Sequence, residues 1–232
     1  MSGLPTLVMI PGTLCDGRVF RRQKHALRGL ADVRVINYRG LGRVEQWALH
    51  LLQTLPPRFS LAGFSLGGLW ALELLRLAPQ RVERIAMIAS NAQAASMAGR
   101  RKSAWLRKLW NDRGPGEVAR HVKPAYFHHE RRRRQHAALV HDMALQTPRK
   151  AAFAEFTWAA TRPDGLAALA GFEGPLLLLS GSRDRLCPPV LQREMQAAQP
   201  SATWIELPRV GHFLPLEAPA RLGAALRRWI QS

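Results

Sequence analysis

Gly63-Phe64-Ser65-Leu66-Gly67-Gly68 is the stretch of this 232-residue chain that decides its fold. It follows the apolar run Phe59 to Ala62, and after it leucines recur at helical spacing until Pro79. The sequence therefore predicts a strand, a sharp turn at Ser65 and a helix. Glycines two positions either side of the serine are expected where such a turn leaves no room for side chains. The alternative interpretation is a glycine-rich turn in which the serine is incidental.

The predicted helix begins next to Ser65, so its free N–H groups and the positive end of its dipole favour negative charge developing there. Acyl transfer develops such a charge. A serine hydroxyl is a weak nucleophile until a neighbouring base takes its proton, and that base needs a third group to fix its tautomer. An active serine at this turn therefore requires a histidine and an acid elsewhere in the chain.

Two loops near the C-terminus offer the acid and the base. Asp184 follows the predicted strand Pro175 to Ser180, and His212 follows the last predicted strand, Thr203 to Leu207. Because parallel strands end at one edge of a sheet, we expect both side chains to lie near Ser65. Taken singly, Asp184 is equally explained as a cap of the next helix and His212 as a surface residue.

Backbone N–H groups are expected to stabilise the oxyanion, one from the residue after the nucleophile and one from a loop near the first strand. Leu66 supplies the first. The loop Pro11 to Gly17 follows the predicted strand Thr6 to Ile10. We expect the Thr13 N–H to be the second donor, with Leu14 as the alternative.

Strands and helices alternate on both sides of a long helical segment. Such alternation predicts a mostly parallel sheet with helices on both faces. Residues 91–172 contain amphipathic helices and no convincing strand, which predicts a core of residues 1–90 and 173–232 with an inserted all-helical lid. One closing helix is expected over Pro215 to Ile230. The predicted strands are Thr6 to Ile10, Val33 to Tyr38, Phe59 to Ala62, Val82 to Ala89, Pro175 to Ser180 and Thr203 to Leu207.

The composition argues against several classes of protein. No apolar run approaches the roughly 20 residues that span a bilayer, and the N-terminus lacks the pattern of a secretion signal. The two cysteines, Cys15 and Cys187, are too few for a disulfide framework and have no zinc-site spacing. Cys15 is expected to be a small buried residue more than a rim residue of the site. We expect a cytoplasmic protein without a membrane segment, metal or cofactor.

Positive charge dominates the chain, with a formal net charge of +18 that comes mostly from arginine. Such a charge attracts polyanions without specificity, but no nucleic-acid-binding motif is visible. The run Arg131 to Arg134 lies in the predicted lid. This run and the other basic residues of the lid are interpreted either as a solvated surface or as a docking surface for an acidic carrier protein or an anionic substrate. The other residues are Arg100, Arg101, Lys102, Arg107 and Lys108.

Four motifs together resemble the α/β-hydrolase family: Pro11-Gly12-Thr13, Gly63 to Gly68, Gly181 to Asp184, and Gly211 to Pro219. The resemblance covers both predicted core segments. It implies a serine nucleophile, an acyl-enzyme, water as the acceptor and the helical insert as a lid. Two features depart from the family pattern, since Pro11-Gly12 replaces the usual His-Gly and the chain begins at what would be the family's third strand.

The sequence thus predicts a serine hydrolase that cleaves a carboxylic ester of a small molecule, with Ser65, His212 and Asp184 as the catalytic triad. The alternatives are a carrier-protein-linked methyl ester esterase, a thioesterase, a carbon–carbon bond hydrolase, a noncatalytic ligand receptor and a basic nucleic-acid-associated protein. Specificity is expected from the lid. Its large aromatic residues are expected either to line an acyl pocket or to pack the lid against the core: Trp105, Trp110, Phe127, Phe153, Phe156 and Trp158.

Overall fold

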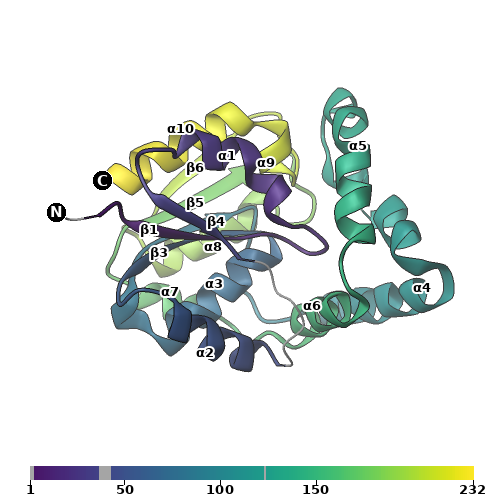
Figure 1. The fold of residues 1–232 in the computed structure, drawn as a ribbon, viewed down its shortest axis with the longest axis horizontal. Helices are drawn as coiled ribbons and strands as arrows, with labels where there is room; N and C mark the ends of the chain where they lie inside the picture. The colour runs from purple at the N-terminus through teal and green to yellow at the C-terminus, as the bar shows by residue number, and fades with distance from the viewer. Residues whose placement is uncertain (1–2, 37–42, 123) are drawn as a thin grey trace.

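A six-stranded sheet runs through the centre of the molecule, in the order β2-β1-β3-β4-β5-β6 (Figure 1). The structure is a computed structural model that describes residues 3–36, 43–122 and 124–232. Each neighbouring pair of strands is parallel. The strands are β1 (Thr6–Ile10), β2 (Asp32–Val35), β3 (Phe59–Phe64), β4 (Val82–Ile88), β5 (Leu176–Gly181) and β6 (Thr203–Leu207).

These bounds confirm the predicted parallel sheet. The exception is the second strand, which was expected to reach Tyr38 but ends at Val35; residues 37–42 lie outside the described ranges. Asp32 to Val35 form an edge strand with a half-exposed burial pattern, whereas β3 and β5 are buried along their whole length. Continuous apolar runs such as Leu176 to Leu179 are typical of strands covered on both faces.

Helices cover both faces because alternate residues of each strand point to opposite sides. In β1, Val8 and Ile10 pack with the helices α2 (Val44–Thr54), α3 (Leu66–Leu77) and α8 (Pro189–Ala198). Leu7 and Met9 pack with Phe20 and with α10 (Pro219–Gln231), which contacts α1 (Arg21–Ala26). The short 3-10 helices η1 (Gly17–Phe20) and η2 (Pro79–Arg81) complete these connections.

The closing helix predicted over Pro215 to Ile230 is two helices, α9 (Leu214–Glu217) and α10. Ala218 separates them with a non-helical backbone, at φ −131° and ψ 49°. Proline disfavours the helical conformation of the residue before it, so Pro219 ends one helix and begins the next.

Between β4 and β5 the described residues form helices and no strand, as predicted. The elements are α4 (Met97–Val122), η3 (Pro124–Tyr126), α5 (Glu130–Leu145), α6 (Arg149–Thr161) and α7 (Leu166–Ala170). Helix α4 is kinked at Gly114, whose φ is 79°, and Pro115 follows it. Helices α4, α5 and α6 lie beyond the carboxyl ends of the strands, whereas α7 packs on the core helices α3 and α8 (Figure 1).

No helix in the described ranges has both the length and the apolar character needed to cross a membrane.

Candidate active site

Ser65 sits on a strained turn between β3 and α3. Its backbone has φ 53° and ψ −119°, a conformation rare for residues other than glycine. Hydrogen bonds hold it there: Ser65 N–H donates to the Ile88 carbonyl at 2.8 Å, and the Ser90 hydroxyl donates to the Ser65 carbonyl at 2.7 Å. The neighbouring strand β4 and Ser90, two residues after its end, therefore fix the turn that the sequence predicts.

The glycines around Ser65 are required by close backbone contact. A Cβ atom on Gly63 would lie 2.4 Å from the Gly67 carbonyl oxygen, and one on Gly67 would lie 2.0 Å from the Ile10 carbonyl oxygen. Neither backbone atom can move without displacing a strand or a helix. The contact between Gly67 and Ile10 brings the start of α3 against the end of β1. The turn therefore lies next to the loop that follows β1.

His212 and Asp184 form a hydrogen-bonded chain with Ser65. The His212 Nε2 atom lies 2.9 Å from Ser65 Oγ, and His212 Nδ1 lies 2.8 Å from Asp184 Oδ2. An ionised carboxylate only accepts hydrogen bonds, so Nδ1 carries the proton and Nε2 accepts from the serine hydroxyl. The three side chains predicted at one edge of the sheet are thus in direct contact.

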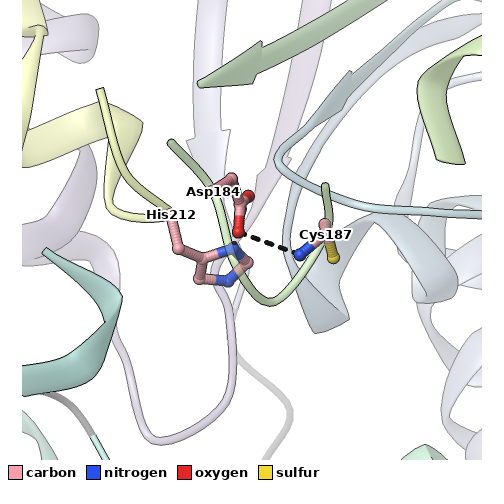
Figure 2. Close-up of side chains that lie close together, drawn as sticks. All are labelled: Asp184, Cys187 and His212. Carbon is pink, nitrogen blue, oxygen red and sulfur yellow. Dashed lines mark hydrogen bonds and ion pairs between the residues drawn. The ribbon is translucent and has the colours of Figure 1, made fainter. Parts of the chain in front are cut away.

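The Asp184 carboxylate is held from its other side by its own loop. Asp184 Oδ1 accepts the N–H groups of Leu186 at 2.8 Å and Cys187 at 2.9 Å. Figure 2 shows the carboxylate between the His212 ring and the Cys187 backbone. Asp184 and His212 are almost wholly buried, at 3% and 2% exposure. The backbone N–H groups fix the carboxylate, and the fixed carboxylate in turn orients the imidazole ring through Nδ1.

The His212 loop is bonded to the segment that joins α4 and α5. The His212 N–H donates to the Tyr126 carbonyl at 2.8 Å. The buried Glu217 carboxylate accepts N–H groups from His128, His129 and Gly211 at 3.0 to 3.1 Å. Burial raises the pKa of the Glu217 carboxyl above its ordinary value, and the three N–H groups act in the opposite direction. Glu217 therefore ties the insert to the loop that carries His212.

Thr13, in the loop after β1, and Leu66, at the start of α3, both line one cavity. Leu66 is the first residue of α3, where helical N–H groups have no acceptor inside the helix. The alternative donor, Leu14, has its N–H directed elsewhere. Its N–H donates at 2.7 Å to the buried Glu155 carboxylate of α6. Leu14 has a positive φ of 51°. Nothing in the local sequence indicated that its N–H would point toward α6.

The Leu14 side chain also belongs to the insert more than to the core. It is 1% exposed and packs with Leu106, Trp110 and Phe156. These residues come from α4 and α6 and form the small apolar cluster that holds the helices of the insert together. Cys15, the next residue, is buried in the core cluster with Phe20, which confirms the expectation that it is a small packed residue.

A cavity of about 400 Å³ opens over Ser65 and His212, between the sheet edge and the insert. Its volume is in the range of small-molecule sites, roughly 300–1,000 Å³. Of the six large aromatic residues expected to line a pocket or to pack, Phe156 alone lines this cavity within the described ranges. Trp110 and Phe153 pack edge-on against each other and contact Phe156, and Phe127 stacks on Phe213.

The remaining two aromatic residues take opposite positions. Trp158 is buried in the core cluster beneath α3, and Trp105 is 46% exposed.

Sequence reasoning assigned no role in the site to several polar residues that line or support the cavity. These are Tyr126, Arg162 and Cys187 on the wall, with Glu155 and Glu217 behind it. Lys102, also on the wall, was expected only as one of the basic residues of the lid. Only Glu217 had a local signal, because it belongs to the Gly211 to Pro219 motif.

Asp184, Cys187 and His212 also form a group whose ligand atoms all lie within 4.8 Å of one another (Figure 2). Metal ions bind cysteine as the thiolate. Burial raises the pKa of the Cys187 thiol to about 12, so the thiol keeps its proton near neutral pH. Both Asp184 oxygens and His212 Nδ1 are already engaged with each other or with the backbone. The donor set therefore fits a hydrogen-bonded acid and base better than a metal centre.

A family model described as "Alpha/beta hydrolase family" matches residues 7–225. Among curated proteins, the biotin biosynthesis bifunctional protein BioHC of Cellvibrio japonicus is 32% identical over 97 residues. That match covers 38% of this chain and 19% of the relative, so the aligned region spans about a fifth of the relative's length.

Solved structures share the fold over nearly the whole chain. A thermophilic esterase from Thermogutta terrifontis has a TM-score of 0.86 at 24% identity, covering 99% of this chain and 90% of the other. The enol-lactonase from Burkholderia xenovorans LB400 has a TM-score of 0.88 at 23% identity, covering 100% and 93%. At these identities the likeness concerns the fold.

Replacing Gly67 with alanine is expected to lower the free energy of unfolding by about 3 kcal/mol or more, since the new Cβ overlaps backbone that cannot move. Urea denaturation measures this change. Gly3→Ala is the control, because a Cβ there meets no atom within 4 Å. Equal stability of Gly67→Ala and the unsubstituted chain would show that the elbow is looser than its geometry indicates.

Glu155→Ala should cost about 1–3 kcal/mol of stability, because the buried Leu14 N–H loses its acceptor. Glu155→Gln keeps an acceptor oxygen and should lose less. Thermal or chemical denaturation of both variants gives the comparison, with the exposed Glu173→Ala as the control. The contact between Glu155 and Leu14 contributes nothing if alanine and glutamine have the same effect as the control.

Both cysteines should resist alkylation by iodoacetamide at about pH 8 in the folded protein. Cys15 and Cys187 are 7% and 5% exposed, and the pKa of about 12 leaves almost no Cys187 thiolate at that pH. Mass spectrometry of native and urea-unfolded samples follows the modification, and the unfolded sample should react at both positions. Fast alkylation of native Cys187 would mean that its thiol is ionised and open to the cavity.

Proposed function

Because this chain belongs to the alpha/beta hydrolase family, we propose that it is a serine hydrolase that cleaves a carboxylic ester of a small molecule. The observation that carries the proposal is the hydrogen-bonded chain from Ser65 through His212 to Asp184, which opens into a cavity of about 400 Å³. Ester hydrolysis needs a serine hydroxyl beside an imidazole nitrogen and a carboxylate on the other nitrogen, which is the arrangement of these three side chains.

In the first half-reaction, His212 Nε2 takes the Ser65 proton as Ser65 Oγ attacks the ester carbonyl. Asp184 keeps the imidazole oriented and stabilises its positive charge. The carbonyl oxygen gains negative charge and moves toward the N–H groups of Leu66 and Thr13. The tetrahedral intermediate collapses when His212 returns the proton to the leaving alcohol, which leaves an acyl group on Ser65.

In the second half-reaction, water takes the place of the alcohol. His212 removes a proton from this water, whose oxygen attacks the acyl carbon. Collapse of the second intermediate breaks the bond to Ser65 Oγ, and His212 returns the proton to the serine. The products are the carboxylic acid and the alcohol, and the protein returns to its starting state.

The basic surface of the insert favours a second candidate, an ester or thioester carried by an acidic carrier protein. Arg131 and Arg134 are exposed on α5, which forms the outer part of the insert in Figure 1. Complementary charge steers an acidic partner to such a surface. This candidate uses the same nucleophile and differs in that a carrier protein delivers the substrate.

A carbon–carbon bond hydrolase would also use these three residues, whereas a noncatalytic receptor would use the cavity alone.

A fluorophosphonate probe should label Ser65 covalently, and the protein should hydrolyse p-nitrophenyl esters of short acids. Ser65→Ala should abolish the labelling, and Asp184→Asn should lower kcat by about three to four orders of magnitude, because the imidazole loses its orienting acceptor. Gel fluorescence and release of p-nitrophenolate measure the two effects. Ser201→Ala is the matched control, since Ser201 is an exposed serine whose hydroxyl donates to the Gln199 side chain.

Labelling that persists in Ser65→Ala would place the nucleophile elsewhere. A protein that takes no label and hydrolyses no ester would be a receptor with a hydrolase fold. Hydrolysis of a carrier-linked ester that falls with salt, beside salt-independent hydrolysis of a neutral short ester, would favour the carrier-protein candidate.

A further inference from the structure

Two positively charged side chains line the cavity above Ser65. Lys102 and Arg162 are on its wall, and no aspartate or glutamate is among the described residues that line it. A small, partly enclosed cavity strengthens the attraction between such cations and an anion, because water screens the charges less than at an open surface. The charge of the wall therefore bears on which substrates enter.

Lys102 is held in place by a neutral group. Its Nζ atom donates to the Tyr126 hydroxyl at 3.2 Å and lies 5.3 Å from the centre of the Tyr126 ring. Burial raises the pKa of Tyr126 well above its ordinary value, so the hydroxyl stays protonated. Tyr126 therefore positions the ammonium group through a neutral hydroxyl and its ring.

Arg162 is oriented by backbone carbonyls in a similar way. Its Nε donates to the Gln93 carbonyl at 3.0 Å and its Nη1 to the Ala159 carbonyl at 2.5 Å. The ion pairs found among the described residues include none with Arg162. Of the five guanidinium N–H groups, three are left for other acceptors. The two carbonyls fix the plane of the guanidinium and leave its charge unneutralised.

The two cations line the same cavity as Cys187 of the acid loop and the nucleophile Ser65. Burial raises the pKa of Cys187 to about 12, and the charges of Arg162 and Lys102 act in the opposite direction. Cys187 lines the cavity and donates its N–H to Asp184. An anionic group bound between the cations would thus sit close to the reacting ester.

We propose that Lys102 and Arg162 form a subsite for a carboxylate of the substrate, so that the preferred substrates are esters of acids that carry a second carboxylate group. The proposal rests on the ester hydrolysis proposed above. Arginine pairs with a carboxylate through two parallel N–H groups, and lysine adds a point charge. A monoester of a short dicarboxylic acid places its ester at Ser65 and its free carboxylate at the two cations.

The test compares kcat/KM for p-nitrophenyl hydrogen succinate, glutarate and adipate with that for neutral p-nitrophenyl esters of the same acyl length. For at least one length, we expect the charged ester to be preferred by about tenfold or more. Lys102→Met should lower this ratio by about tenfold. Arg162→Lys keeps a positive charge but loses the two parallel N–H groups, so it should lower the ratio less than Lys102→Met does.

Arg101→Met is the matched control, since Arg101 neighbours Lys102 on α4, is exposed and does not line the cavity. It removes the same charge and should leave the ratio unchanged. An equal fall in Arg101→Met would show that overall charge, and no subsite, sets the preference. Ratios near one at every acyl length, with normal hydrolysis of neutral esters, would overturn the subsite while leaving the proposed function intact.

Binding to Ser65→Ala tests the subsite without any turnover. Calorimetric titration with monomethyl glutarate and monomethyl adipate should show binding that Lys102→Met weakens about tenfold and Arg101→Met does not. Failure of both monoesters to bind would overturn the proposal even if the protein hydrolysed no ester. Inorganic phosphate is the second titrant, and phosphate that binds as tightly as the monoesters would overturn carboxylate as the ligand.

Discussion

The close contact between Gly67 and the Ile10 carbonyl is the constraint on which the rest of the proposed site depends. A Cβ at that position would lie 2.0 Å from the carbonyl oxygen, so the start of α3 and the end of β1 meet backbone to backbone. Ser65, the Leu66 N–H and the loop with Thr13 are brought together as a result. The turn stores backbone strain at Ser65, and the sheet on one side and α3 on the other hold that strain in place.

Around this contact, the site is built from loops that bond to one another more than to the sheet. Asp184 takes its orientation from its own loop, and His212 takes its position from the Tyr126 carbonyl and Asp184. Glu217 joins the His212 loop to the segment before α5. Each of these bonds is buried or partly buried, where a lost partner is expensive, and together they reduce the motion of the imidazole ring.

The sequence predicted the sheet and the three residues of the hydrogen-bonded chain because each has a local signal. Ser65 lies between required glycines, and Asp184 and His212 each follow an apolar strand. The bond from the Leu14 N–H to Glu155 could not be predicted, because Glu155 is 141 residues away in the chain. Lys102 and Arg162 were not predicted as a pair, since the packing of α4 against α6 places them on one wall and no periodicity reports that packing.

The insert is bonded to two different parts of the proposed site. The Glu155 carboxylate of α6 accepts the N–H of Leu14, in the loop after β1, and the Tyr126 carbonyl accepts the N–H of His212. A motion that lifted the insert away from the sheet would break both bonds at once. The open form would therefore lack an ordered oxyanion loop and a well-placed base. Closure of the insert and the ordering of these groups would then be coupled, so that a substrate that favours the closed form would also favour the ordered groups.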